Sequence, residues 1–171
     1  MSATRTAEEL KSALAAVFPA LSEKIRVQRE RRVWVDVERG DFRKLFDHAY
    51  RELGFTILCI ITGLDEGDNL GFIYHIADFG GTMLSIHVLA PKSDPSIGTI
   101  TDIFPAAHIY ERELVDLLGA KVAGLPGGNR YPLPDGWPEG QYPLRKDWDP
   151  SVLDAGGVEA AAAAAASKEG V

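Results

Sequence analysis

Apolar residues recur at helical spacing in two segments of the first half of the chain. Residues 7–17 are predicted to form a helix with Thr6 as its cap and with the apolar positions Leu10, Leu14 and Val17 on one face. Residues 41–53 form a clearer amphipathic pattern, with Asp41 as the expected cap and Gly54 as the expected end. The apolar stripe of this second helix consists of Phe42, Leu45, Phe46, Ala49, Tyr50 and Leu53.

Four segments have the alternation or the β-branched content that is typical of strands. They are residues 33–37, 56–61, 71–78 and 83–89. The polar residues 62–69 are expected to form a loop, and Gly80-Gly81 is expected to form a two-residue hairpin turn. In that register His75 and His87 point to opposite faces of the sheet, so the sequence predicts that they cannot bind one metal ion together.

The connections around the first strand suggest how the sheet begins. The basic cluster before the strand is interpreted as a solvated face, with an anion-binding patch as the alternative, because Glu23 and Glu30 interrupt it. Its members are Lys24, Arg26, Arg29, Arg31 and Arg32. The first strand, helix 41–53 and strand 56–61 could form a right-handed parallel crossover. His48 lies off the apolar stripe of that helix and is expected at the surface.

A last helix is predicted over residues 105–118, with Pro105 in its first turn and Gly119 at its C-terminal cap. Its apolar stripe consists of Tyr110, Leu114, Leu117 and Leu118, and the remaining arc carries Glu111, Arg112, Glu113 and Asp116. Together with the strands, these helices indicate an α+β fold in which N-terminal helices pack on a mixed sheet with an antiparallel hairpin.

The chain changes character after this helix, since residues 119–150 contain six glycines and six prolines. Large apolar side chains persist there, which is unusual for a disordered linker. They are Leu125, Tyr131, Leu133, Trp137, Tyr142, Leu144 and Trp148. We therefore expect an α+β domain over residues 1–119 and an extended docking arm over 120–150, laid on this chain or on another subunit. The Ala-rich residues 151–171 are expected to be a frayed helix or a flexible tail.

Composition and charge exclude several classes of function. The 171 residues carry a formal net charge of −7, so nucleic acid is not an expected partner. The one cysteine, Cys59, lies in an apolar run and is expected to be buried. A single thiol cannot build an iron–sulfur cluster or a Cys-rich zinc site. We expect neither a membrane span nor a signal peptide.

Candidate catalytic groups gather on the last predicted helix, between His108 and Asp116. Paired carboxylates near a histidine could act as general acid and base. The structural interpretation is favoured, because acids and a basic residue early in a helix suit its capping and its dipole. The chain has no glycine-flanked nucleophile and neither the Walker nor the dinucleotide-binding spacing. Whether the chain is an enzyme on its own is therefore left open.

Four spaced motifs resemble the signature of the 30 kDa subunit of respiratory complex I and of its relatives in membrane-bound hydrogenases. They are Tyr110-Glu111-Arg112-Glu113, Asp116-Leu117-Leu118-Gly119, Leu133-Pro134-Asp135-Gly136-Trp137 and Pro143-Leu144-Arg145-Lys146-Asp147. The resemblance covers about residues 30–150. Complex I members usually carry Asn-Trp where this chain has His108-Ile109, and residues 131–148 look more like the energy-converting hydrogenase version, so that branch is favoured over the NADH:quinone branch.

The resemblance implies a cofactor-free structural subunit in the peripheral arm of a membrane-bound, ion-translocating oxidoreductase. It implies a hydrogenase-like large subunit and an iron–sulfur small subunit as partners, with antiporter-like membrane subunits met only indirectly. The [NiFe] centre and the iron–sulfur clusters would lie in those partners, and the chain would sit on the cytoplasmic face of the membrane. The expected partner-binding residues are Tyr110, Glu111, Arg112, Glu113, Asp116, Trp137, Leu144, Arg145, Lys146, Asp147 and Trp148. A free-standing adaptor protein and an enzyme using the His108 to Asp116 cluster are the alternatives.

Overall fold

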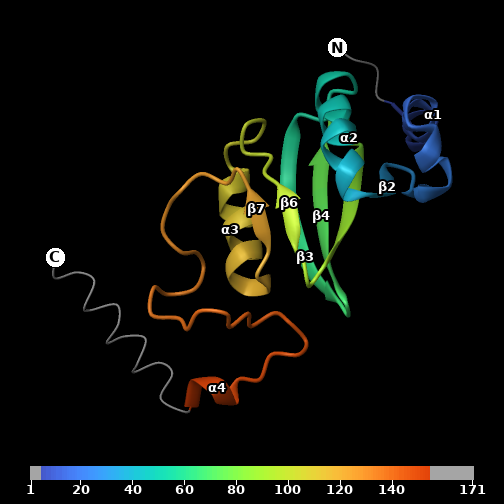
Figure 1. Ribbon diagram of the computed structural model, residues 1–171. Coiled ribbons are helices and arrows are strands. Elements are labelled where there is room, and N and C mark those ends of the chain that lie inside the picture. The colour runs from blue at the N-terminus through green and yellow to red at the C-terminus, as the bar shows by residue number, and fades with distance from the viewer. Residues whose placement is uncertain (1–4, 155–171) are drawn as a thin grey trace. The chain divides into compact units, whose positions relative to one another are not determined.

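A mixed five-stranded sheet is the centre of the first of two units in this computed structural model (Figure 1). The structure describes residues 5–154, and the predictions for the tail beyond them lie outside that range. The first unit contains the residues up to Gly63 together with Gly71–Ala90, and the second contains Leu64–Leu70 and the residues from Pro91 onward.

The sheet has the strand order β1-β2-β5-β4-β3. The strands are β1 (Ile25–Arg29), β2 (Arg32–Val37), β3 (Ile57–Glu66), β4 (Asn69–Ala77) and β5 (Met83–Pro91). Strand β2 is antiparallel to β1 and parallel to β5, which makes the sheet mixed. This α+β architecture, with its N-terminal helices, confirms the fold class expected from the sequence.

Helix α2 (Arg39–Arg51) covers one face of the sheet (Figure 1). The centroid of its Phe42 ring lies 4.6 Å from that of the Tyr74 ring of β4, and the centroid of its Phe46 ring lies 5.9 Å from the same point. All three side chains are fully buried, so the aromatic stripe predicted for this helix does form the core. The helix begins at Arg39, with Glu38 rather than Asp41 at the N-cap.

Helix α1 (Ala7–Val17) confirms the first predicted helix and its cap. The Thr6 hydroxyl accepts a hydrogen bond from the Glu9 amide, and the Glu9 carboxylate accepts one from the Thr6 amide. This reciprocal capping box satisfies two amides that the helix cannot bond internally. The expected stripe is wrong at Val17, which is exposed, while Leu10 and Leu14 are fully buried.

Three predictions about the sheet are corrected. A short 3₁₀ helix (Pro19–Lys24) and strand β1 occupy the basic segment, so that segment pairs with β2 instead of only leading into it. Strand β3 continues to Glu66, and only Gly67 and Asp68 form the turn where residues 62–69 were expected to be a loop. Strand β3 lies at the far edge of the sheet, so the connection through α2 leads from β2 to a strand that is not its neighbour. Cys59 on β3 is half-buried rather than interior.

The predicted β4–β5 register is also wrong. The Asp78 amide donates to the Thr82 carbonyl at 3.1 Å, so three residues, not two, form the hairpin loop. The shift of one residue moves every side chain of β5 to the other face relative to β4. His75 therefore shares a face with His87, and its Nδ1 lies 2.8 Å from Ser85 Oγ.

The second unit contains β6 (Ser96–Gly98), β7 (Lys121–Ala123), α3 (Ala107–Leu118) and the short α4 (Ser151–Asp154). Strands β6 and β7 pair in parallel, and α3 lies beside β7 (Figure 1). Helix α3 begins two residues later than predicted and ends, as expected, at Gly119 with φ 73°. Strands β6 and β7 were not predicted, because strands of three residues are too short to show alternation.

Candidate functional site

The arm (residues 120–150) lies along α3, and three sets of hydrogen bonds connect the two. The first comes from Arg112, whose guanidinium donates to the Pro126 carbonyl at 2.6 Å and to the Asn129 carbonyl at 3.1 Å. The guanidinium passes so close to Gly128 that a Cβ there would lie 2.4 Å from Nη2. The start of the arm is therefore fitted to the Arg112 side chain.

The second set runs through Asp116 and Arg130. Asp116 is buried, and its Oδ1 accepts from Arg130 Nε at 3.3 Å. Arg130 Nη1 donates in turn to the Trp137 carbonyl at 2.7 Å. The middle of the arm is thus connected to α3 through one ion pair. Asp116, which the sequence placed on the arc outside the apolar stripe, is thus buried as well.

The third set lies at the C-terminal end of α3. The carbonyls of a last helical turn have no partner within the helix. Here the Leu117 carbonyl accepts from the Leu144 amide at 3.0 Å, and the Leu118 carbonyl accepts from Arg145 Nε at 2.7 Å. The Arg145 guanidinium also lies over the Tyr142 ring, 4.5 Å from its centroid. The positive side chain suits the negative end of the helix dipole.

Held in this way, the arm leaves four large apolar side chains at least partly accessible, and we call these four the arm surface: Tyr131, Trp137, Leu144 and Trp148. Tyr131 and Leu144 are exposed, and the two indoles are half-buried with their rings 6.0 Å apart. Gln141 joins the indoles, since its carbonyl accepts from Trp137 Nε1 and its side-chain oxygen accepts from Trp148 Nε1. Apolar rings with satisfied polar atoms are typical anchors of protein interfaces.

Glu111 faces inward and is fully buried. Its carboxylate accepts from Thr99 Oγ1 at 2.5 Å and from the Ile100 amide at 2.8 Å. Burial raises the pKa of this carboxyl, although these two hydrogen bonds oppose the shift. The sequence placed Glu111 outside the apolar stripe of the helix, and the structure shows that this position is nevertheless buried.

The expected partner-binding residues thus lie in different surroundings. Leu144, Lys146 and Asp147 are exposed, and a further set is half-buried: Tyr110, Arg112, Glu113, Trp137, Arg145 and Trp148. Sequence reasoning missed Arg130 and Tyr142, which hold the arm in place. Only the basic and aromatic character of these two residues within a proline-rich segment could have indicated them.

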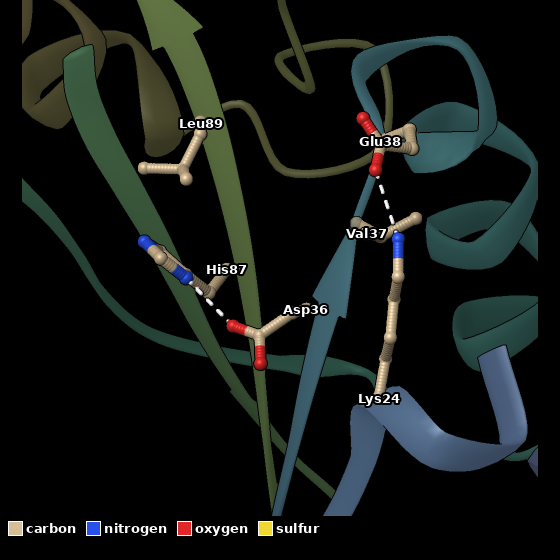
Figure 2. Close-up of a pocket in the computed structure, with 6 residues that line it drawn as sticks. All are labelled: Lys24, Asp36, Val37, Glu38, His87 and Leu89. Carbon is tan, nitrogen blue, oxygen red and sulfur yellow. Dashed lines mark hydrogen bonds and ion pairs between the residues drawn. The ribbon is translucent and has the colours of Figure 1, made fainter. Parts of the chain in front are cut away.

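A second candidate is a shallow hollow of about 210 Å³ in the first unit, shown in Figure 2. His87 Nδ1 lies 2.8 Å from Asp36 Oδ1, and Lys24 Nζ lies 2.8 Å from Glu38 Oε1. Burial of Asp36 opposes its ionisation, but hydrogen bonds from Trp34 and His87 lower its pKa below the usual value. The acidic and basic side chains that line the hollow are thus paired with one another, as is common for charged residues near a protein surface.

Within residues 5–154, no group of three or more His, Cys, Asp or Glu side chains is arranged to hold a metal ion. In the same range no helix has both the length and the apolar character needed to cross a membrane.

Comparison with known proteins identifies the family. Residues 35–152 match the family of the respiratory-chain NADH dehydrogenase 30 Kd subunit. The chain belongs to this family. It is 40% identical over 122 residues to the membrane-bound hydrogenase subunit beta of Pyrococcus furiosus, covering 68% of this chain and 69% of the relative. It is 31% identical over 129 residues to the NADH-quinone oxidoreductase subunit 5 of Thermus thermophilus, covering 68% of this chain and 61% of the relative.

A solved structure of the membrane-bound sulfane sulfur reductase, an archaeal respiratory membrane complex, contains a similar chain. That chain is 28% identical, the TM-score is 0.73, and the match covers 86% of this chain and 88% of the other. Proteins similar to this chain are thus subunits of several oxidoreductase complexes.

Proposed function

We propose that this 30 kDa family member is a structural and assembly subunit of a membrane-bound, ion-translocating oxidoreductase. It docks the catalytic large subunit through α3 and the arm. The observation that carries the proposal is an arm tied to α3 along its length while it displays the arm surface outward. Large apolar side chains that gather at the surface of one segment are a common feature of protein interaction sites.

Within the family, the energy-converting hydrogenase branch is favoured. The 40% identity to a hydrogenase subunit supports this choice, against 31% to the NADH-quinone oxidoreductase subunit. The equivalent role in an NADH:quinone oxidoreductase is the second candidate. It is supported by the 31% identity over 129 residues to the NADH-quinone oxidoreductase subunit. In the favoured branch the large subunit carries the [NiFe] centre, an iron–sulfur small subunit supplies electrons, and this chain holds no cofactor.

A surface substitution tests the docking role without disturbing the fold. Leu144 is 54% exposed, so Leu144→Ser removes an anchor at little cost to the free chain. Val17 is 51% exposed on α1, so Val17→Ser is a matched control. The chain, tagged and expressed in its own host, is purified from detergent-solubilised membranes, and the nickel and iron that co-purify are measured.

Loss of the co-purifying metals in Leu144→Ser but not in Val17→Ser supports docking through the arm. Full recovery of both metals in Leu144→Ser, and in a chain truncated after Gly119, would refute it and favour the adaptor alternative. Iron without nickel in the wild-type complex would favour the quinone-reducing branch.

A further inference from the structure

The tip of the β3–β4 hairpin, residues 64–70, belongs to the same unit as α3 and the arm. One acid of this tip, Asp65, has a side chain that is only 1% exposed. A carboxylate removed from water to this extent must be compensated by donors.

Three donors surround the Asp65 carboxylate. Oδ2 accepts from Lys92 Nζ at 2.7 Å and from the Lys146 backbone amide at 2.8 Å, while Oδ1 accepts from the Gly67 amide at 2.9 Å. The Lys92 hydrogen bond is the largest cause of a pKa of about 2 for Asp65, and the two amides lower it further against the effect of burial. The carboxylate is thus charged and fully engaged at neutral pH.

One of these donors belongs to the arm. Lys146 is 81 positions from Asp65 in the chain, so this hydrogen bond closes a long loop. Lys92 strengthens the connection, because its ammonium also lies 3.3 Å from Asp147 Oδ1. Lys92 is itself tied to the hairpin tip, since its amide donates to the Asp68 carbonyl at 2.9 Å. The hairpin tip and the arm therefore share one charged cluster.

The arm residues of this cluster, Lys146 and Asp147, lie between two side chains of the arm surface. Leu144 precedes the Lys146 amide by two residues, and Trp148 follows it by two. The intervening Arg145 is held by the Leu118 carbonyl. Residues 145 and 146 are thus fixed from within the chain, while the side chains of Leu144 and Trp148 remain available to a partner.

We infer that Asp65 is a positioning residue, which fixes the arm surface in its docking shape before any partner is present. The partner then meets a preformed site, and the chain does not lose further conformational freedom on docking. The partner's role rests on the proposed function, but the fixed arm is a property of this chain alone.

Hydrogen exchange of the full-length chain, read by NMR at the Lys146 amide, tests the inference directly. In the wild type we expect protection of at least about a hundredfold over an unstructured amide. Asp65→Ala should lower it by about tenfold or more, and Asp65→Asn, which keeps one acceptor oxygen, should have an intermediate effect. Asp147→Asn is the control, because Asp147 is 69% exposed and lies only at the rim of the cluster.

A wild-type Lys146 amide that exchanges at the unprotected rate overturns the inference without any variant. Unchanged protection in Asp65→Ala overturns it as well. Amides of β2 and β5 are the internal reference, since a local role leaves them unaffected.

The positioning role is tested by measuring assembly in the host, as the nickel and iron that co-purify with each variant. Asp65→Ala should lower the nickel and iron recovered per folded chain by about fivefold, and Asp65→Asn should restore part of the loss. Exchange that accelerates while recovery stays at the wild-type level shows that the contact exists but positions nothing, which overturns the inference. Failure of the docking proposal would appear instead as full metal recovery in Leu144→Ser, independently of the Lys146 amide.

Discussion

Gly119 offers a test of whether the arm is fitted to the end of α3. The residue has φ 73°, a left-handed conformation that costs a non-glycine residue about 1–2 kcal/mol. A Cβ at this position would lie 2.5 Å from two ring atoms of Tyr142 and 2.8 Å from Arg145 Nη2. Gly119→Ala therefore strains the backbone and also displaces both side chains.

The displacement has a cost that can be worked from the contacts. The hydrogen bond from Arg145 to the Leu118 carbonyl is charge-assisted, and such bonds contribute about 1.5–3 kcal/mol. Added to the backbone strain, the expected loss in the free energy of unfolding is about 2.5–5 kcal/mol. Gly140→Ala is the matched control, because Gly140 has φ 76° but no atom within 4 Å of the added Cβ. It should lose only the backbone part, about 1–2 kcal/mol.

Urea denaturation of the full chain measures both losses. Two of the three tryptophans, Trp137 and Trp148, lie in the arm, so indole fluorescence reports mainly on that segment. Hydrogen exchange at the Leu144 amide gives a local reading, because this amide bonds to the Leu117 carbonyl. Equal destabilisation by Gly119→Ala and Gly140→Ala, with the Leu144 amide still protected in both, would refute the fitted arm.

Four further outcomes are expected. Thr6→Ala removes the capping box of α1 and should cost about 1 kcal/mol in thermal or urea denaturation, whereas Ser22→Ala should cost less. Phe42→Ala leaves a cavity against Tyr74 and should cost about 3–5 kcal/mol in the same assay. The pKa of Asp65 is lowered to about 2, so its contribution is present above pH 4 and is lost as the pH falls toward 2, with a matching NMR titration of the Lys146 amide. The pKa of Glu111 is raised by burial, so its ionisation lowers stability as the pH rises through the folded pKa, and Glu111→Gln should remove this part of the pH profile.

Local sequence signals predicted the helices well, because their determinants lie within a few residues of one another. The capping box at Thr6, the aromatic stripe of α2 and the left-handed end of α3 at Gly119 each follow from neighbouring side chains. The family could likewise be recognised from motifs of four or five adjacent residues, which the match over residues 35–152 confirms.

Register could not be predicted with the same success. The Gly80-Gly81 pair suits a two-residue turn, yet Asp78 caps a three-residue loop through its side chain and main chain. One additional residue in the loop reverses the facing of every position on β5 relative to β4. The relation between His75 and His87 therefore depended on a detail of the turn that composition does not encode.

Burial of acidic residues was decided by the tertiary structure alone. By itself the sequence determined helices α1, α2 and α3, the segments that form β2, β3, β4 and β5, the family, and the apolar character of the arm. Only the folded chain decided that Glu111 and Asp116 turn inward and that Asp65 meets Lys92 and Lys146. A buried carboxylate must be paired with donors, and when these come from distant segments of the chain no pattern of neighbouring residues reveals them.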